Sequence, residues 1–420
     1  MLHPPQEDSV VEAPRTALLL ELAAGLQRVG TPPGRVEHTL EDVSHSLGIR
    51  GRFFALPSAV LASLYEGGRE QTRLVPAPSG ETDLVALEGL RRVGRDVVAG
   101  TLSPVQARSR IAQIMSAPPE FGRVVTVLSF GWVSALAALI FGGGPMEAAV
   151  AGFAGALIGA MQVGASSRGL SGLLEAGSAS VAAFVAATLA VALPHSAEIA
   201  VLAALIVLVP GFTIHRALTD LSTGHLLSGS SRMAHAGTVL LLMGFGVALG
   251  GRAAGALVGA PSFVEPMGIP VWQRVVALLV MTPALRVLFR APQGSSLWIA
   301  GAVSIAWFGS MGGSYLLGPD LGPFLGALAL GLYALLWEKM ADRPAALPLA
   351  PGLLVLVPGA IGFRGVAALL GGDPMRAVET GFSAMLVATS LVTGLLLANV
   401  LVRGGVPRDA LRDVPWHDPA

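Results

Sequence analysis

Residues 207–232 read VLVPGFTIHRALTDLSTGHLLSGSSR, and this stretch decides how the rest of the chain is interpreted. An apolar run reaches Pro210 and Gly211 and then continues with a helical pattern that takes in polar residues. Proline has no N–H and crowds the carbonyl one turn earlier, so it interrupts a helix. In a membrane such a break is tolerated only where protein or a water-filled cavity satisfies the freed backbone groups. The stretch therefore predicts a broken helix inside a membrane protein.

The same break recurs later in the chain as Val357-Pro358-Gly359. An arginine follows each proline after six residues, as Arg216 and Arg364, and the two prolines lie 148 residues apart (358 minus 210). The repetition predicts two related halves.

The composition favours a helical protein that crosses the membrane many times. Hydrophobic residues make up 53% of the chain, charged residues only 13%, and there are 53 glycines, which let transmembrane helices approach closely. The net charge of +0 gives no indication of nucleic-acid binding, and the absence of Cys excludes disulfides and thiolate metal sites. The polar N-terminus, with a first apolar run that is short and carries Glu21, is a poor signal peptide, so we expect it to stay in the cytoplasm.

The first 120 residues hold 26 of the 54 formal charges and predict a small cytoplasmic α+β domain over 17–120, after a disordered segment 1–16. The periodicity predicts two amphipathic helices (about 17–29, and around Val36–Leu47), short strands at 52–56, 59–65 and 72–75, and a helix over 83–99. Ser103, Pro104 and Gln106 predict a capped start for the helix that ends near Met115. Ala117-Pro118-Pro119 is expected to be the hinge into the membrane.

His38, Asp42 and His45 share one face of the second helix. Their spacing would suit a metal, but one helix with no supporting partners indicates a solvated polar face. We therefore predict no metal site and no cofactor.

Ten apolar segments from Val124 onward approach the length of about 20 residues that a membrane span needs. They are expected at 124–141, 146–165, 175–193, 197–217, 233–250, 271–290, 296–313, 319–337, 348–370 and 376–402. With the N-terminus inside, eleven Lys and Arg residues fall on the cytoplasmic side and four fall outside (Arg252, Arg274, Arg364 and Arg376), so both termini are expected in the cytoplasm.

The Pro-Gly breaks fall in spans four and nine, the fourth span of each set of five. Because five is odd, the two sets must cross the membrane in opposite directions, which predicts a 5+5 inverted repeat. Its halves are expected at 121–268 and 269–403, followed by a cytoplasmic tail at 404–420. Interrupted spans in matching positions are the sequence pointer to the binding site of secondary transporters.

A broken helix exposes N–H groups that attract a carboxylate and carbonyl groups that suit an ammonium. Paired breaks therefore suit a small amino acid or a carboxylate, and the predicted substrate-binding residues are Pro210, Gly211, Thr213, Pro358 and Gly359.

Ionisable residues near these breaks are candidates for coupling or gating. Arg216 and Asp220 lie four residues apart and can pair on one helix face. An interfacial anchor with its counter-ion is the alternative for this pair, and an anchor is the alternative for Arg364. His215 titrates in the neutral range when unperturbed. Glu175 opens span three, where it would also favour a helix N-terminus.

No nucleophile elbow, metalloprotease motif or phosphate-binding glycine loop is present, so the chain is not predicted to be an enzyme or an ATP-driven pump. The energy for transport is expected from an ion gradient or from the gradient of the substrate.

Several motifs, in order, resemble the threonine/serine exporter family of bacterial inner-membrane proteins, over about 17–403. They include AAGLQRVGTPPGRVEHTLEDVSHSLGI (23–49), LEGLRRVGRDVVAGTLSPVQARSRIAQI (87–114), FGWVSALAALIFGGGPMEAAVAGFAGALIGAM (130–161) and LVPGFTIHRALTDLSTGHLLSGSSR (208–232). LVLVPGAIGFRGVAALL (354–370) resembles the companion domain that some bacteria encode separately, which makes this chain similar to the fused form.

The resemblance implies export of threonine or serine across the inner membrane by the proton motive force. Split relatives are associated with dicarboxylates, so an exporter or channel for dicarboxylates such as succinate is the alternative. The expected partners are the substrate, the proton and the lipid bilayer, and homo-oligomerisation is left open.

Overall fold

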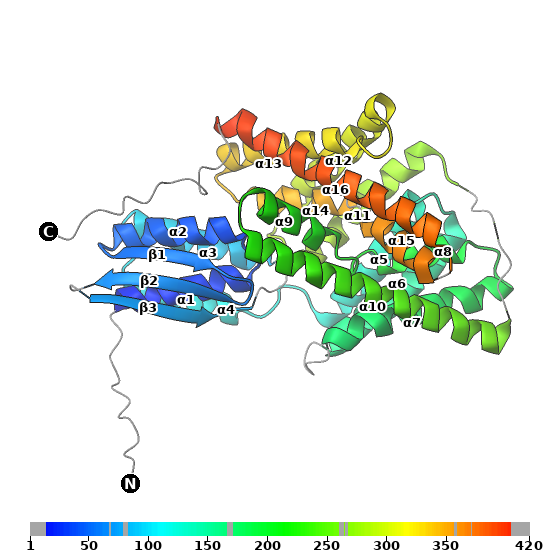
Figure 1. The fold of residues 1–420 in the computed structure, drawn as a ribbon, viewed down its shortest axis with the longest axis horizontal. Helices are drawn as coiled ribbons and strands as arrows, with labels where there is room; N and C mark the ends of the chain where they lie inside the picture. The colour runs from blue at the N-terminus through cyan, green and yellow to red at the C-terminus, as the bar shows by residue number, and fades with distance from the viewer. Residues whose placement is uncertain are drawn as a thin grey trace, which may run out of the picture. The chain divides into compact units, whose positions relative to one another are not determined.

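The structure is a computed structural model that describes residues 14–66, 69–78, 83–165, 171–259, 264, 268–356, 359–370 and 372–404. It divides into two compact units, Met1–Pro118 and Pro119–Ala420. The first combines helices with a small sheet, and the described residues of the second form helices joined by loops (Figure 1).

The described residues of the first unit form four helices and a three-stranded antiparallel sheet in the order β1-β2-β3. The elements are α1 (Pro14–Arg28), α2 (Pro33–Ser46), β1 (Arg50–Ala55), β2 (Ala59–Glu66), β3 (Arg69–Pro76), α3 (Leu84–Val98) and α4 (Pro104–Ser116). The predicted helices and strands are all present, and β3 begins three residues earlier than expected.

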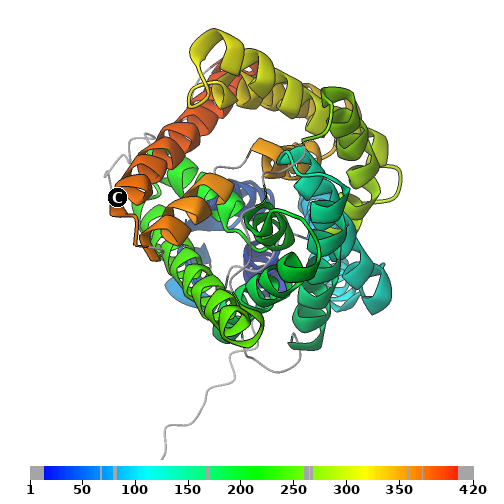
Figure 2. The same ribbon diagram turned by 90° about the vertical axis from the view of Figure 1, so that its right-hand side faces the viewer.

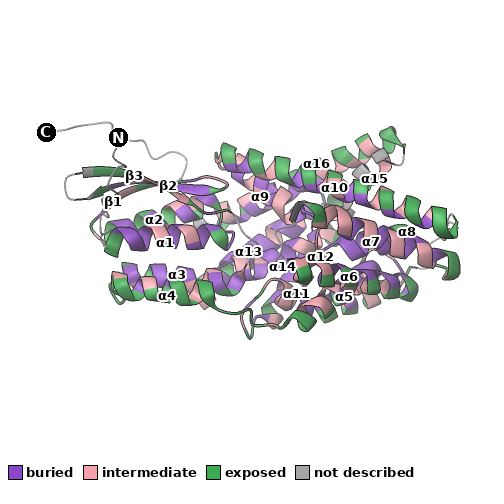
Figure 3. Cartoon of the chain, turned by 90° about the horizontal axis from the view of Figure 1, so that it is seen from below, coloured by how far each residue is buried: buried purple, intermediate pink, exposed green. Residues whose placement is uncertain are grey.

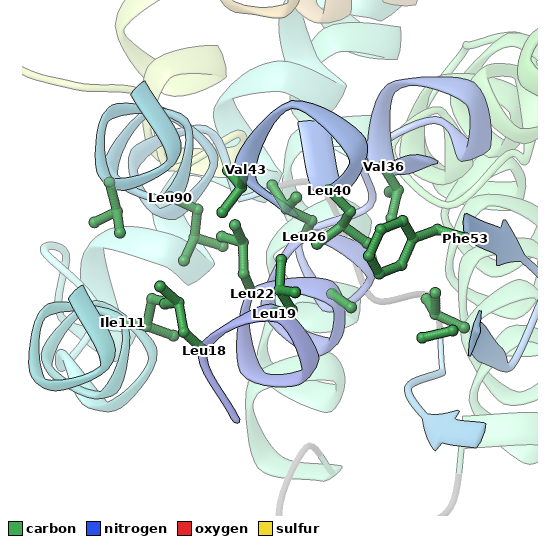
Figure 4. Packing of buried hydrophobic residues seen from close by; sticks show 14 of the residues in the cluster. Leu18, Leu19, Leu22, Leu26, Val36, Leu40, Val43, Phe53, Leu90 and Ile111 are labelled. Carbon is green, nitrogen blue, oxygen red and sulfur yellow. The ribbon is translucent and has the colours of Figure 1, made fainter. Parts of the chain in front are cut away.

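The core of this unit comes from the apolar faces that the periodicity indicated (Figure 4). Leu18, Leu22 and Leu26 of α1 are buried, and they pack with Leu40 of α2 and Leu90 of α3. On the sheet, alternate residues point to one face.

The predicted capping of α4 is confirmed. The Ser103 hydroxyl accepts a hydrogen bond from the N–H of Gln106, and the Gln106 side chain accepts one from the N–H of Ser103. Asp83 caps α3 in a similar way by accepting from the N–H of Ala86 at 2.9 Å. These caps satisfy N–H groups that the first turn of a helix leaves unpaired.

The second unit consists of long apolar helices with two pairs of short ones. The elements are α5 (Arg123–Ile140), α6 (Pro145–Ala165), α7 (Ser171–Ala192), α8 (Ala197–Leu205), α9 (Gly211–Ser222), α10 (Leu226–Val258), α11 (Val271–Leu288), α12 (Ser296–Leu317), α13 (Pro323–Ala341), α14 (Ala346–Leu356), α15 (Gly359–Leu370) and α16 (Pro374–Arg403).

Eight segments of the described residues are long and apolar enough to cross a membrane, counting α14 and the start of α15 together as Ala346–Gly365. The sequence predicted ten. The two others correspond to the predicted spans 197–217 and 296–313. The first is divided into α8 and α9, each too short to cross alone. The second is α12, which has 22 residues but includes several Ser, Gly, Trp and Tyr residues.

Exposed apolar side chains mark the faces that would meet lipid. On α10, Leu241, Phe245 and Leu249 follow one another at four-residue spacing and are each more than half exposed. Figure 3 shows exposed residues along both α10 and α16. Such large exposed apolar surfaces are unusual on soluble proteins and are typical of membrane contact.

The helices α5–α10 and α11–α16 make matching sets of contacts. The first set packs α5 on α6, α7 on α10 and α9 on α10, and the second packs α11 on α12, α13 on α16 and α15 on α16. The short helices cross between the sets, because α9 packs against α16 and α15 packs against α10.

The two first helices of these sets, α5 and α11, run antiparallel. Glu120, just before α5, forms an ion pair with Arg286 near the end of α11 at 2.7 Å. In the middle, the indole nitrogen of Trp132 donates to the carbonyl of Val280 at 3.1 Å. Beyond the other end of α5, a Cβ placed on Gly142 would lie 3.7 Å from a guanidinium nitrogen of Arg274 on α11.

Candidate functional site

The break in the first half lies between two short helices. α8 ends at Leu205 and α9 begins at Gly211, as Pro210 predicted. Every residue of α8 from Ile199 to Leu205 is buried, and Figure 2 shows this short green helix inside the bundle. α9 packs against α10, α14, α15 and α16, so it lies between the two sets of helices.

One face of α9 packs tightly on α10. A Cβ placed on Gly229 of α10 would lie 2.6 Å from Cγ of Leu221 and 2.8 Å from the carbonyl oxygen of Ala217. Only glycine fits at this approach. The corner before it is formed by Gly224, whose φ of 90° favours a residue without a side chain.

The same corner carries a buried ion pair. The Nε of Arg232 lies 3.1 Å from Oδ2 of Asp220, and the two side chains are 14% and 6% exposed. The sequence named Arg216 as the partner of Asp220 but missed Arg232. The missed signal was the position of Arg232 two turns into the helix that follows Gly224, where a helical corner brings it back to α9.

A second face of α9 points toward the second set of helices. Phe212 packs against the core formed by α12, α13, α14 and α16. The guanidinium of Arg216 lies over the Phe212 ring, 4.6 Å from its centroid. Phe212, Arg216 and Thr219 follow the three- and four-residue spacing of one helix face.

His215 lies beside this face and is 5% exposed. Its Nε2 lies 3.5 Å from the hydroxyl of Thr219, which also donates to the His215 carbonyl at 3.0 Å. Its Nδ1 is buried and has no hydrogen-bond partner among the described residues.

The family model for "Putative threonine/serine exporter" matches residues 17–253, which is more than half of the chain. The chain belongs to the threonine/serine exporter family. A second model, "Threonine/Serine exporter, ThrE", matches residues 274–401, so both parts of the fused form are present, as the sequence predicted.

Curated relatives from yeasts are similar at low identity. "Pheromone-regulated membrane protein 10" of Saccharomyces cerevisiae is 23% identical over 92% of this chain and 54% of its own length. The protein of the same name from Zygosaccharomyces rouxii is 24% identical over 83% of this chain and 36% of its own length. The chain therefore spans about half or less of these relatives. No solved structure matches.

The remaining predicted residues of this exporter-family chain are distributed over both sets of helices. Thr213 is partly buried on α9. Gly359 begins α15, and Pro358 lies outside the described residues. On α15, the Nε of Arg364 lies 3.7 Å from Oε1 of Glu198 on α8, and both side chains are well exposed. Glu175 on α7 is separate from α9, and its Oε2 is buried with no hydrogen-bond partner among the described residues.

Sequence reasoning missed a buried carboxylate that ties two loops together. Glu147 is 4% exposed, and its two oxygens accept hydrogen bonds of 2.8 Å from the N–H groups of Gly144 and Ser196. Its first-turn position in α6 was the available signal, since an acidic residue there meets free N–H groups. The arrangement joins the start of α6 to the start of α8.

The His38–Asp42 pair of α2 is exposed, with 3.7 Å between Nε2 and Oδ2. Within the described parts of the chain, no group of three His, Cys, Asp or Glu residues is placed to hold a metal.

Proposed function

We propose that this chain is a secondary-active exporter of small amino acids such as threonine or serine, driven by the proton motive force across the bacterial inner membrane. The observation that carries the proposal is the broken helix α8–α9, which lies against the second set of helices through α14, α15 and α16. Membership of the exporter family supplies the direction of transport and the class of cargo.

An inverted repeat of five plus five spans underlies this proposal. The bounds of α5 and α11 differ by 148 at both ends (271 minus 123 and 288 minus 140), and so do those of α9 and α15 (359 minus 211 and 370 minus 222). This is the spacing of Pro210 and Pro358. The antiparallel course of α5 and α11 is the direction that an inverted repeat requires.

The contact between Trp132 and Val280 supports a two-fold axis at this place. These residues are also 148 apart (280 minus 132), so each occupies the position of the other in its own half. Across a two-fold axis, equivalent positions meet only at the axis itself.

The corners after the broken helices support the same register. Gly224 and Gly372 are 148 apart and have φ values of 90° and 85°. The N–H of His225 donates to the Asp220 carbonyl at 2.8 Å, and the N–H of Asp373 donates to the Ala368 carbonyl at 3.0 Å. Both members of the second bond are shifted by 148 from those of the first.

On this basis ten spans are formed, with α8–α9 together as span four and α12 as span seven. Both termini lie in the cytoplasm, following the bias of Lys and Arg. At 1.5 Å per residue the 33 residues of α10 extend for about 50 Å, more than a hydrocarbon core of about 30 Å. The corner at Gly224 therefore lies at the cytoplasmic boundary.

The substrate would bind between the two breaks. The N-terminal turns of α9 and α15, which begin at Gly211 and Gly359, would favour a carboxylate, while Thr213 would bond a substrate hydroxyl. Among the gating candidates, Arg364 and Glu198 join α15 to α8 across the two halves and would separate when the outer side opens. Glu175 would act on the first break from α7, which packs against α8.

Exchange across proteoliposomes tests the cargo. Vesicles loaded with unlabelled threonine should accumulate labelled threonine, and excess serine should compete while excess succinate should not. If succinate, and not serine, competes with labelled threonine, the transported substrate belongs to the dicarboxylates. Absence of exchange for all three solutes, with folded protein in the vesicles, would reject the proposed function.

A further inference from the structure

His215 occupies a position that the second half fills with an apolar ring. The residue 148 positions later is Phe363, on α15. Phe363 is 4% exposed and packs into the core formed by α6, α7, α8 and α10, that is, into the half to which it does not belong. In the two-fold arrangement His215 takes the corresponding place against the second half.

An imidazole in such a place is costly to the fold. A buried polar atom without a hydrogen-bond partner loses its bond to water and gains nothing in return, whereas an apolar ring of similar size incurs no such loss. Nδ1 of His215 is such a buried atom, with no hydrogen-bond partner among the described residues. Ionisable groups retained at membrane depth generally serve transport or proton transfer.

Titratable residues lie on α9 itself and on three of the four helices that pack against it. Helix α9 carries His215, Arg216 and Asp220, and α10 carries Arg232 and His235 near its start and Arg252 toward its far end. Of the other helices packed against α9, α14 has no titratable residue, α15 has Arg364, and α16 has Arg376 and Glu379 in its first two turns and Arg403 at its far end. The acidic side chain on α9 itself is Asp220.

Asp220 already forms an ion pair with Arg232. Its ion pair with Arg232 is almost fully buried and closes the corner between α9 and α10. Breaking a buried pair leaves an uncompensated charge, so this carboxylate is poorly suited to exchange protons in each transport cycle. Among the residues that the structure describes, Nδ1 of His215 has no hydrogen-bond partner, and His215 forms no ion pair. Histidine is also the side chain whose ordinary titration lies nearest neutral pH.

We propose that His215 is the proton-binding residue of this exporter, an inference that rests on the proposed function. When the site faces outward, the free ring nitrogen takes one proton from hydronium, and water and an imidazolium result. When the site faces inward, the imidazolium returns that proton to water. The imidazolium and the ammonium group of an amino acid are both cations, so a site in a medium of low dielectric binds one at the expense of the other. This exclusion couples proton entry to amino-acid exit.

Two substitutions at this position test the proposal in the full chain. His215→Phe places the residue of the second half at this site and should fold as well as the wild type. His215→Gln keeps a polar side chain that does not titrate. Both variants should retain threonine exchange. The factor by which an imposed pH gradient accelerates threonine efflux should fall at least tenfold. His235→Gln, at an exposed position of the neighbouring helix α10, is the matched control and should behave as the wild type.

A second readout does not depend on the cargo. In protein with ¹⁵N-labelled histidine, the imidazole signal that is missing from His215→Phe should titrate within the pH range over which the protein stays folded. Gradient-driven efflux that is unchanged in both His215 variants, or a His215 signal that does not titrate in that range, would overturn the inference. If the wild type exchanges no threonine, the proposed function fails, and the titration still decides whether His215 binds a proton.

Discussion

Asp220 and Arg232 form a buried ion pair that closes the corner between α9 and α10. At the equivalent corner of the second half, 148 residues later, the positions are occupied by Ala368 and Thr380. The backbone turn is the same in both corners, but only the first has the ion pair. The corner at Gly224 thus carries a charge interaction that the corner at Gly372 lacks.

Removing one charge from this corner should destabilise the protein. Asp220→Asn leaves Arg232 buried without its counter-ion, and a cost of about 3–5 kcal/mol is expected for breaking a buried pair. The unfolding free energy of the detergent-solubilised chain measures it. The double variant Asp220→Asn with Arg232→Gln should recover most of that loss, and additive losses would show that the two side chains do not interact.

The neighbouring glycines Gly250 and Gly251 of α10 should respond in opposite ways to alanine. A Cβ on Gly250 would run into the carbonyl of Ser180 on α7, whereas one on Gly251 meets nothing within 4 Å. Gly250→Ala should therefore cost about 1–3 kcal/mol or more through overpacking. Gly251→Ala should be neutral, or stabilise by up to about 1 kcal/mol through helix propensity. Equal melting temperatures for the two variants would contradict the packing of α7 against α10.

Glu147 should be structural and not part of proton coupling. Its carboxylate accepts from two backbone N–H groups, and Glu147→Ala leaves both buried N–H groups without a partner. We expect the free energy of unfolding to fall by about 2–6 kcal/mol, because each buried N–H group without a partner costs about 1–3 kcal/mol. Glu147→Gln should lose less and keep the response of transport to a pH gradient. If Glu147→Gln is as stable as the wild type but its transport no longer responds to a pH gradient, Glu147 takes part in proton coupling.

The meeting of α5 and α11 can be tested by cross-linking, because the chain has no Cys. Trp132→Cys combined with Val280→Cys should be joined by a short bifunctional maleimide, since the Trp132 side chain reaches the Val280 backbone. Trp132→Cys combined with Phe245→Cys is the control, because α5 packs on α6, α8 and α11 while Phe245 is exposed on α10. Efficient linking in the control pair alone would contradict the arrangement.

The sequence predicted those features that depend on local pattern. Pro210 located the break between α8 and α9, and Ser103 with Gln106 located a capped helix start, because both act within one turn. Neither α8 nor α9 alone reaches the length needed for a crossing, because the break divides the predicted span. α12 was harder to assign for another reason, since Ser, Gly and Tyr reduce its mean hydropathy.

Features that depend on two distant segments were not accessible from pattern alone. The partner of Asp220 is twelve residues away and comes into reach only through the corner at Gly224. Glu147 meets Ser196 from another helix, 49 residues along the chain. The sequence named His215 as one coupling candidate among several. The burial of its counterpart Phe363 among residues of α6, α7, α8 and α10 depends on tertiary packing that no local pattern shows.

The central claim is tested most directly by the rate of threonine efflux from loaded proteoliposomes that contain the wild-type chain, with and without an acidic exterior. A proton-coupled exporter should empty the vesicles several-fold faster when the outside is more acidic, and a protonophore should abolish the difference. Efflux at the same rate with and without the gradient would contradict proton coupling.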